Sequence, residues 1–255
     1  MRGRNPLDRL TTLLQHRALS TKIDSTLQKR SLQFPSTDEL YDLWPVLISQ
    51  QRVMHTLSFF DPSCNPKTTL KNLTQGRRIQ KNLFEIWYFL HHDPIFIMEI
   101  GTRTGMSLVN KLAFHGRPED CVVLCFDLFV EGGSPQFVKN NLQYMGIPSD
   151  NVYFVVGDSR ITVPAALSRI KDFRQFDYIL VDGAHDADTA YEDLKNVLPF
   201  VKAGGCIVFD DAGPDELGEG HDLIRVWNAL FEKHKHQFDC YYYNLPYGFC
   251  VAKRR

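Results

Sequence analysis

The spacing of hydrophobic residues changes at about residue 95 of the chain. Before it, apolar residues recur at helical spacing, within 40–55 and again within 75–90. After it, short apolar runs rich in β-branched residues alternate with amphipathic stretches that suit helices. We therefore predict strands at 95–100, 122–127, 152–156, 177–182 and 206–210, with helices between them at 106–115, 136–145, 161–171 and 187–198.

Strands that alternate with helices predict right-handed βαβ units and a parallel sheet. The end of the chain has a different order: a helix near 222–234, an apolar run at 238–243, a turn at 244–248 and a last apolar run at 249–252. This order predicts a hairpin. The expected fold class is α/β: a Rossmann-like, doubly wound and mostly parallel sheet that ends in an antiparallel hairpin.

Residues 1–74 precede this pattern, and we expect them to form an N-terminal helical cap on the α/β domain of residues 75–255. A helix start signal lies in the cap. Ser36 or Thr37 can accept hydrogen bonds from the free backbone N–H groups of a helix, and Glu39 falls in its first turn.

Composition narrows the function classes. At 255 residues the chain fits one α/β domain with an appendage, or two small domains. A net charge of -1 and a pI of about 6.7 give no sign of a nucleic-acid surface, and no apolar run is long enough to cross a bilayer. The six cysteines lack Cys-x-x-Cys spacing, so we expect buried, reduced thiols in a cytoplasmic protein.

A glycine turn follows the first predicted strand of the sheet. Gly101 and Gly105 come directly after the apolar run 95–100 and before the helix at 106–115. A strand, a turn and a helix place backbone N–H groups at the carboxyl edge of the sheet, where ligands bind in open α/β folds. A sharp turn would explain both glycines without a ligand. Glu99 favours a site, because an acidic residue at the end of a buried strand needs a partner.

Acidic residues end or follow every strand of the parallel series. They are Glu99, Asp127, Asp158, Asp182 and the pair Asp210-Asp211. Capping of the next helix explains Asp158, but it explains Asp127 and the adjacent pair poorly. Asp127 lies roughly twenty residues beyond Gly105, the distance at which an acidic side chain binds ribose in nucleotide folds. Arg103 stands where a dinucleotide fingerprint has its second glycine, which disfavours NAD.

These motifs together resemble a known family. Glu99-Ile-Gly-Thr-Arg-Thr-Gly105, with Asp127, Gly157-Asp-Ser159 and the terminal hairpin, resembles the class I S-adenosylmethionine-dependent methyltransferases. More narrowly, Phe176-Asp-Tyr-Ile-Leu-Val-Asp-Gly-Ala-His185 and Gly204-Gly-Cys-Ile-Val-Phe-Asp-Asp211 resemble the metal-dependent O-methyltransferases of the catechol, caffeoyl-CoA and macrolide-sugar types. The resemblance covers about 75–252 and does not extend to 1–74.

The resemblance implies roles for individual residues. Glu99, Gly101 and Ser107 would hold the methionine end of S-adenosylmethionine, Thr102 and Gly105 would complete the cofactor loop, Asp127 would bind the ribose, and Asp158 with Ser159 would line the adenine. Asp182, Asp210 and Asp211 would hold a divalent metal, Mg²⁺ by preference, and His185 would be the general base. Two residues depart from the pattern: Asp211 is often Asn in the catechol type, and Arg103 is unusual in the glycine loop.

The residues support this chemistry on their own terms. Three carboxylates that converge on one point suit a hard cation such as Mg²⁺, and a hydroxyl bound to that ion loses its proton more easily. His185 can accept this proton near neutral pH, after which the oxyanion attacks the sulfonium methyl group. The predicted function is therefore an S-adenosylmethionine-dependent, Mg²⁺-assisted O-methyltransferase for a small hydroxylated molecule.

Two alternatives stay open. One is an NAD-linked oxidoreductase, and the other is a non-catalytic methyltransferase-like protein that binds partners through its helical cap. The sequence predicts no nucleic-acid or membrane partner, is compatible with a homo-oligomer, and does not identify the methyl acceptor.

Overall fold

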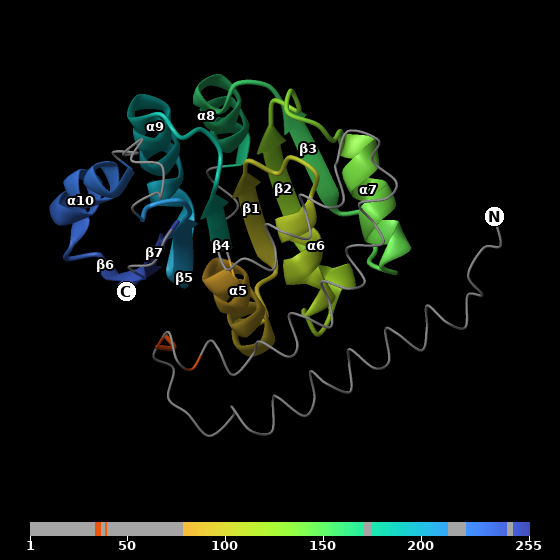
Figure 1. The fold of residues 1–255 in the computed structure, drawn as a ribbon, viewed down its shortest axis with the longest axis horizontal. Coiled ribbons are helices and arrows are strands. Elements are labelled where there is room, and N and C mark those ends of the chain that lie inside the picture. The colour runs from red at the N-terminus through yellow and green to blue at the C-terminus, as the bar shows by residue number, and fades with distance from the viewer. Residues whose placement is uncertain (1–33, 37–38, 40–78, 171–174, 214–222, 244–246) are drawn as a thin grey trace. The chain divides into compact units, whose positions relative to one another are not determined.

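The computed structural model describes residues 34–36, 39, 79–170, 175–213, 223–243 and 247–255 (Figure 1). Most of the predicted cap, its boundary at residue 74, and the segments 214–222 and 244–246 therefore lie outside the described residues. The helix start in the cap is confirmed. Ser36 Oγ accepts a hydrogen bond from Glu39 N at 3.3 Å, and Glu39 Oε2 accepts one from Ser36 N at 2.8 Å. This reciprocal arrangement is a capping box.

The described strands form a seven-stranded sheet in the order β3-β2-β1-β4-β5-β7-β6. Their bounds are β1 Phe96–Ile100, β2 Val122–Asp127, β3 Val152–Val156, β4 Phe176–Val181, β5 Val201–Phe209, β6 Phe238–Tyr243 and β7 Phe249–Arg254. β1 to β5 pair in parallel, and β7 runs antiparallel to both β5 and β6. The predicted Rossmann-like sheet with its antiparallel hairpin is thus confirmed.

The direction of winding reverses at β1. From β1 the chain moves outward to β2 and β3, then returns to β4 on the other side of β1 and continues to β5. β1 and β4 are neighbours, and their carboxyl ends are joined by a hydrogen bond of 2.9 Å from Asp182 N to Ile100 O. Ligands of open α/β sheets bind at such a switch point.

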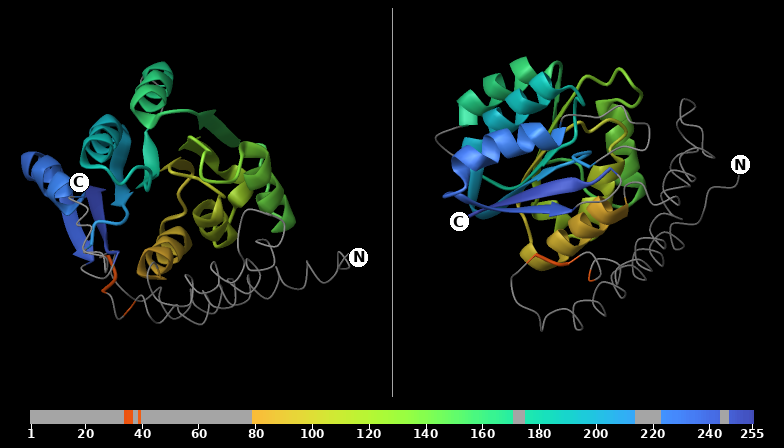
Figure 2. Two further views of the ribbon diagram at one scale, coloured as in Figure 1. Left: turned by 45° about the horizontal axis from the view of Figure 1, so that its top comes forward. Right: turned by 60° about the vertical axis from the view of Figure 1, so that its left-hand side comes forward.

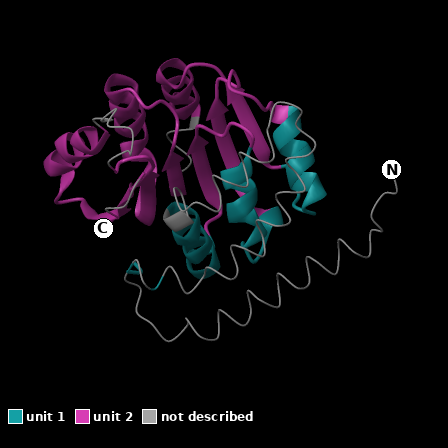
Figure 3. Ribbon diagram, in the orientation of Figure 1, with its two compact units in different colours: residues 1–93, 105–119, 136–150 teal, residues 94–104, 120–135, 151–255 magenta. Residues whose placement is uncertain are grey.

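The chain divides into two compact units (Figure 3). One comprises residues 1–93, 105–119 and 136–150, and the other comprises 94–104, 120–135 and 151–255. The helix bounds are α5 Ile79–His92, α6 Met106–Ala113, α7 Pro135–Tyr144, α8 Ser159–Ile170, α9 Ala187–Val197 and α10 Leu223–His234, with short 3-10 helices η2 Pro118–Asp120 and η3 Leu198–Phe200. The first unit contains α5, α6 and nearly all of α7; the second contains the sheet and α8, α9 and α10. No described helix is long and apolar enough to cross a membrane.

The core of the sheet-containing unit lies between the sheet and three helices. α8, α9 and α10 lie side by side along one face of the sheet (Figure 2). Ile179 of β4 and Ile207 of β5 are fully buried in the same hydrophobic cluster as Leu194 of α9 and Trp227 of α10. The Trp227 ring stacks on Phe209 with centroids 5.9 Å apart. Burial of this apolar surface is the main stabilising contribution, and it fixes the ends of β4 and β5 that carry acidic residues.

The structure differs from the sequence prediction in several details, including the starts of β5 and α8 and the exposure of one cysteine. β5 begins at Val201 instead of 206, because the β4–β5 register shifts between the pairs Phe176–Val201 and Tyr178–Cys206. α8 begins at Ser159 instead of 161, because Asp158 caps it. The expectation that the cysteines are buried is wrong for Cys240, which is exposed on β6, the strand at the end of the sheet; Cys121, Cys125, Cys206 and Cys250 are buried free thiols.

Candidate active site

Gly101 brings the loops after β1 and β4 into contact. Its φ is 91°, which glycine adopts without strain. A Cβ atom at this position would lie 1.8 Å from the carbonyl oxygen of Asp182, so no side chain fits. The predicted cofactor turn and the first predicted metal ligand are therefore adjacent at the switch point.

Asp127, the predicted ribose ligand, organises two loops. Its Oδ2 accepts a hydrogen bond from Arg103 N at 2.7 Å, and its Oδ1 accepts one from Phe129 N. Arg103 has a φ of 51°, and its guanidinium lies 3.4 Å from Glu131 Oε2 in an exposed ion pair. Asp127 does not cap a helix, as the sequence indicated. Each carboxylate oxygen has one of these backbone donors and retains further acceptor capacity.

Two buried polar side chains lie beside this turn in the chain. Glu99, on β1, has no exposed surface. Thr102 is 3% exposed, and its hydroxyl makes no hydrogen bond within the described residues. A buried hydroxyl in this state is costly, and a bound polar ligand would relieve it.

Gly105 and Ser107 lie at the start of α6, in the other unit. Ser107 Oγ lies 2.9 Å from Lys111 Nζ and 3.2 Å from Glu85 Oε2, and Lys111 and Glu85 form a 3.1 Å ion pair that is wholly buried. The lysine ammonium can only donate, so the Ser107 proton points to Glu85. Sequence reasoning missed this network. Its signal is that Lys111 lies one helical turn from Ser107.

Asp158 and Ser159 start α8. Asp158 Oδ1 accepts a hydrogen bond from Arg160 N at 3.0 Å, so Asp158 caps the helix, as the alternative interpretation held. Its carboxylate also pairs with the Arg160 guanidinium at 2.6 Å, and these hydrogen bonds lower the pKa of Asp158. The predicted adenine ligand therefore also has a local structural role.

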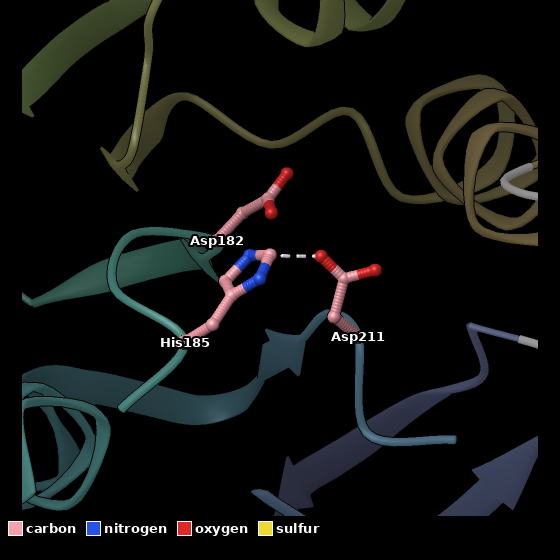
Figure 4. Close-up of side chains that lie close together, drawn as sticks. All are labelled: Asp182, His185 and Asp211. Atoms are coloured by element: carbon pink, nitrogen blue, oxygen red, sulfur yellow. Dashed lines mark ion pairs between the residues drawn. The ribbon is translucent and has the colours of Figure 1, made fainter. Parts of the chain in front are cut away.

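Asp182, His185 and Asp211 form a cluster at the ends of β4 and β5 (Figure 4). One ligand atom from each lies within 4.8 Å of the others, and His185 Nε2 lies 3.0 Å from Asp211 Oδ2. Asp211 is buried and has a φ of 53°, whereas the His185 side chain is 38% exposed. Asp210 is buried but is not part of this cluster. Its role as a metal ligand stays a prediction.

The donor set of this cluster fits a divalent cation. Carboxylates with water suit Mg²⁺ and Mn²⁺, so the two carboxylates can hold such an ion without the imidazole as a ligand. The 4.8 Å limit on the separations is compatible with ligands of a single ion. Asp182 follows β4, and its backbone carbonyl lies against Gly101. A metal ion held by this cluster would therefore be next to the predicted cofactor turn.

Asp193 is a further acidic residue near this site that sequence reasoning missed. It lies on α9 and has no exposed surface. Burial raises its pKa to about 7, while the nearby Ser159 hydroxyl acts in the opposite direction. Its signal was its helical position: it lies three residues after Ala190 and four before Val197, both on the apolar face of α9.

Comparisons with known proteins bear on the fold and the family. Residues 98–212 match the family model described as a methyltransferase domain. A comparison with curated protein sequences finds no significant match.

Solved structures show the same fold. A putative O-methyltransferase from Klebsiella pneumoniae has a TM-score of 0.54 at 16% identity, over 95% of this chain and 99% of that one. The O-methyltransferase TomG from Streptomyces achromogenes, involved in tomaymycin synthesis and solved with S-adenosylmethionine, has a TM-score of 0.54 at 19% identity, over 69% and 79%. An O-methyltransferase from Bacillus cereus in complex with S-adenosylhomocysteine has a TM-score of 0.52 at 15% identity, over 95% and 100%. The resemblance to the class I methyltransferases is confirmed at the level of the fold.

Proposed function

We propose that the protein transfers a methyl group from S-adenosylmethionine to a hydroxyl oxygen of a small molecule, with the assistance of a divalent metal ion such as Mg²⁺. The observation that carries this proposal is the position of the Asp182–His185–Asp211 cluster beside the Gly101 turn at the β1–β4 switch point. The match to a methyltransferase domain favours it over an NAD-linked oxidoreductase.

The cofactor residues proposed from the resemblance are Glu99, Gly101, Thr102, Gly105, Ser107, Asp127, Asp158 and Ser159. Support for the ribose and adenine assignments comes from the surface near Asp127 and Asp158. Leu128 and Val130 are 54% and 77% exposed in the loop after Asp127, and Ile161 is 69% exposed in the first turn of α8. Exposed apolar side chains beside carboxylates suit an adenosine, which has a flat base and a polar sugar.

Asp182 and Asp211, with Asp210, would hold the metal ion. When bound, the ion supplies positive charge that favours loss of a proton from a neighbouring hydroxyl. Asp211 also orients His185. A carboxylate only accepts hydrogen bonds, so His185 Nε2 must carry the hydrogen that it shares with Asp211 Oδ2. In the neutral imidazole, Nδ1 is then the basic atom.

His185 Nδ1 is therefore the proposed proton acceptor. The substrate hydroxyl gives its proton to this nitrogen, and the oxygen forms a bond to the methyl carbon as the carbon–sulfur bond breaks. The electron pair of that bond goes to sulfur, which becomes a neutral thioether. The protein contributes mainly orientation of the two reactants and stabilisation of charge.

The test uses the full chain with methyl-labelled S-adenosylmethionine and a panel of phenols, catechols and sugar derivatives. We expect label transfer that chelator abolishes and that Mg²⁺ or Mn²⁺ restores, while calorimetry still detects cofactor binding in chelator. The variant Asp211→Asn changes a proposed metal ligand. Its control is Asp188→Asn, which changes an exposed acidic residue on α9. The absence of cofactor binding would refute the whole proposal. Full turnover in the presence of chelator would refute only the role of the metal ion. Cofactor binding without transfer to any acceptor would favour the non-catalytic alternative.

A further inference from the structure

Asp193 is a buried acidic residue that the proposed chemistry does not use. Its side chain has no exposed surface, and neither carboxyl oxygen makes a hydrogen bond of normal geometry within the described part of the chain. An ionised carboxylate in this position would lose its hydration, which is strongly unfavourable and outweighs the effect of nearby polar groups. The neutral form is the one that suits this environment.

The carboxyl group lies under the loop that carries the metal-site residues. A Cβ atom built on Gly183 would lie 3.5 Å from Asp193 Oδ2 and 4.0 Å from Gly101 N. Gly183 directly follows Asp182 and precedes His185 by two residues. The Asp193 carboxyl group therefore packs near the point where the loops after β1 and β4 meet.

A second segment faces the same carboxyl group. The hydroxyl of Ser159, the first residue of α8, is close enough to lower the pKa of Asp193, although burial has the larger, opposite effect and raises that pKa to about 7. The charged groups that act on it from α8 and its cap are Asp158 and Arg160, and Asp186 acts from the cap of α9. Arg160 is paired with Asp158, and its effect on Asp193 is smaller than that of burial.

We propose that Asp193 is a positioning residue whose neutral carboxyl group holds Gly183 and Ser159 in place, and thereby fixes the loop that carries Asp182 and His185. The placement of the loop is a property of the fold; its importance for catalysis rests on the proposed function. One buried group would in this way connect the segment expected to line the adenine with the segment expected to bind the metal.

Hydrogen exchange tests this inference without any activity. Two hydrogen bonds report on the two segments: Asp182 N–H to Ile100 O at 2.9 Å, and Thr162 N–H to Asp158 O at 2.8 Å. We expect Asp193→Ala to speed exchange of both amides by about tenfold or more at pH 6, since local opening becomes easier. Asp193→Asn keeps the shape of the neutral acid and should exchange like the parent at that pH.

The comparison across pH separates positioning from simple packing. At pH 8 about nine in ten parent molecules would carry an ionised Asp193 if its pKa is about 7. After correction for the intrinsic change of exchange rate with pH, the parent should show less protection at these two amides at pH 8 than at pH 6. Asp193→Asn should keep its protection. Asp188→Asn is the control on the same helix. Asp193→Asn exchanging as fast as Asp193→Ala at pH 6, or Asp193→Ala exchanging like the parent, would overturn the inference.

A metal-binding measurement links the loop to the site. Binding of Mn²⁺, followed by electron paramagnetic resonance at pH 6, should weaken about tenfold in Asp193→Ala and stay unchanged in Asp193→Asn. Unaltered Mn²⁺ affinity in Asp193→Ala would show that Asp193 does not position the ligands. If the parent itself binds no Mn²⁺, the proposed metal role fails, and the exchange experiment still decides on Asp193. If Asp193→Ala does not fold, the pH comparison of the parent with Asp193→Asn decides instead.

Discussion

His185 Nε2 lies 3.0 Å from Asp211 Oδ2, although the two residues follow different strands, β4 and β5. Asp211 is buried, whereas His185 is partly exposed. The contact therefore joins a fixed carboxylate to an imidazole that solutes can reach. It orients the ring, and under the proposed function the second ring nitrogen would accept the proton of the substrate hydroxyl.

We expect His185→Ala to lower turnover by roughly a hundred- to ten-thousand-fold, the usual scale for loss of a general base. Cofactor affinity should barely change, because no cofactor contact is assigned to this residue. Turnover at saturating substrate and calorimetry with S-adenosylmethionine measure the two quantities. The matched control is His236→Ala, an exposed histidine after α10. A variant that keeps normal turnover but loses substrate affinity would assign His185 to substrate binding instead.

Asp127→Asn should weaken S-adenosylmethionine binding by about 1–3 kcal/mol, the cost of losing a charged hydrogen-bond partner. The structure adds a second reason. The two oxygens of Asp127 accept hydrogen bonds from Arg103 N and Phe129 N, whereas the nitrogen of an Asn amide group can only donate and so loses one of these bonds. Calorimetry gives the affinity. Glu131→Gln in the same region removes only an exposed ion pair and should change binding by less than about 0.5 kcal/mol. Equal affinity of Asp127→Asn and the parent would rule out the ribose assignment.

Much of the fold follows from local sequence signals. The apolar run before Gly101 and the acidic strand ends indicated the parallel sheet and its carboxyl edge, because strand burial and turn chemistry are set by nearby residues. The early start of β5 could not be predicted in this way. After Val201, the residues Lys202–Gly205 do not form an apolar run, and they join the strand through a shift in register with β4.

The composition of the site was harder to predict than its location. The cluster contains His185 with Asp182 and Asp211, but not Asp210. This composition depends on side-chain direction and on the left-handed backbone at Asp211. Neither property is encoded in residue spacing. The burial of Lys111 depends in the same way on Glu85, a residue 26 positions earlier in the chain.

Lys111→Met should destabilise the protein by about 3–5 kcal/mol, because it leaves the Glu85 carboxylate buried without its ion-pair partner. Urea unfolding measures the change in free energy. The double variant Glu85→Leu with Lys111→Met should recover much of the loss, because it removes both charges. Lys195→Met breaks an exposed pair with Glu192 and should cost less than about 1 kcal/mol. Additive effects of the two single changes at Glu85 and Lys111 would show that the pair is not coupled.

Asp193 should make the protein less stable as pH rises. Its pKa is raised from 3.8 to about 7 in the folded chain, so between these values the folded state holds a proton that the unfolded state has released. The stabilisation from this proton is complete below about pH 4 and disappears as pH rises through about 7. One pKa unit corresponds to about 1.4 kcal/mol, so the total change is on the order of 4 kcal/mol.

Urea unfolding of the parent and Asp193→Asn at several pH values isolates this contribution. The free energy of unfolding of the parent, minus that of Asp193→Asn, should fall across pH 4 to 7 and level off above it. Asp188→Asn, which changes an exposed acidic residue of the same helix, is the control. Parallel stability curves for the parent and Asp193→Asn would mean that the Asp193 carboxyl group ionises normally, and that its burial is relieved by movement of α9 or the Gly183 loop.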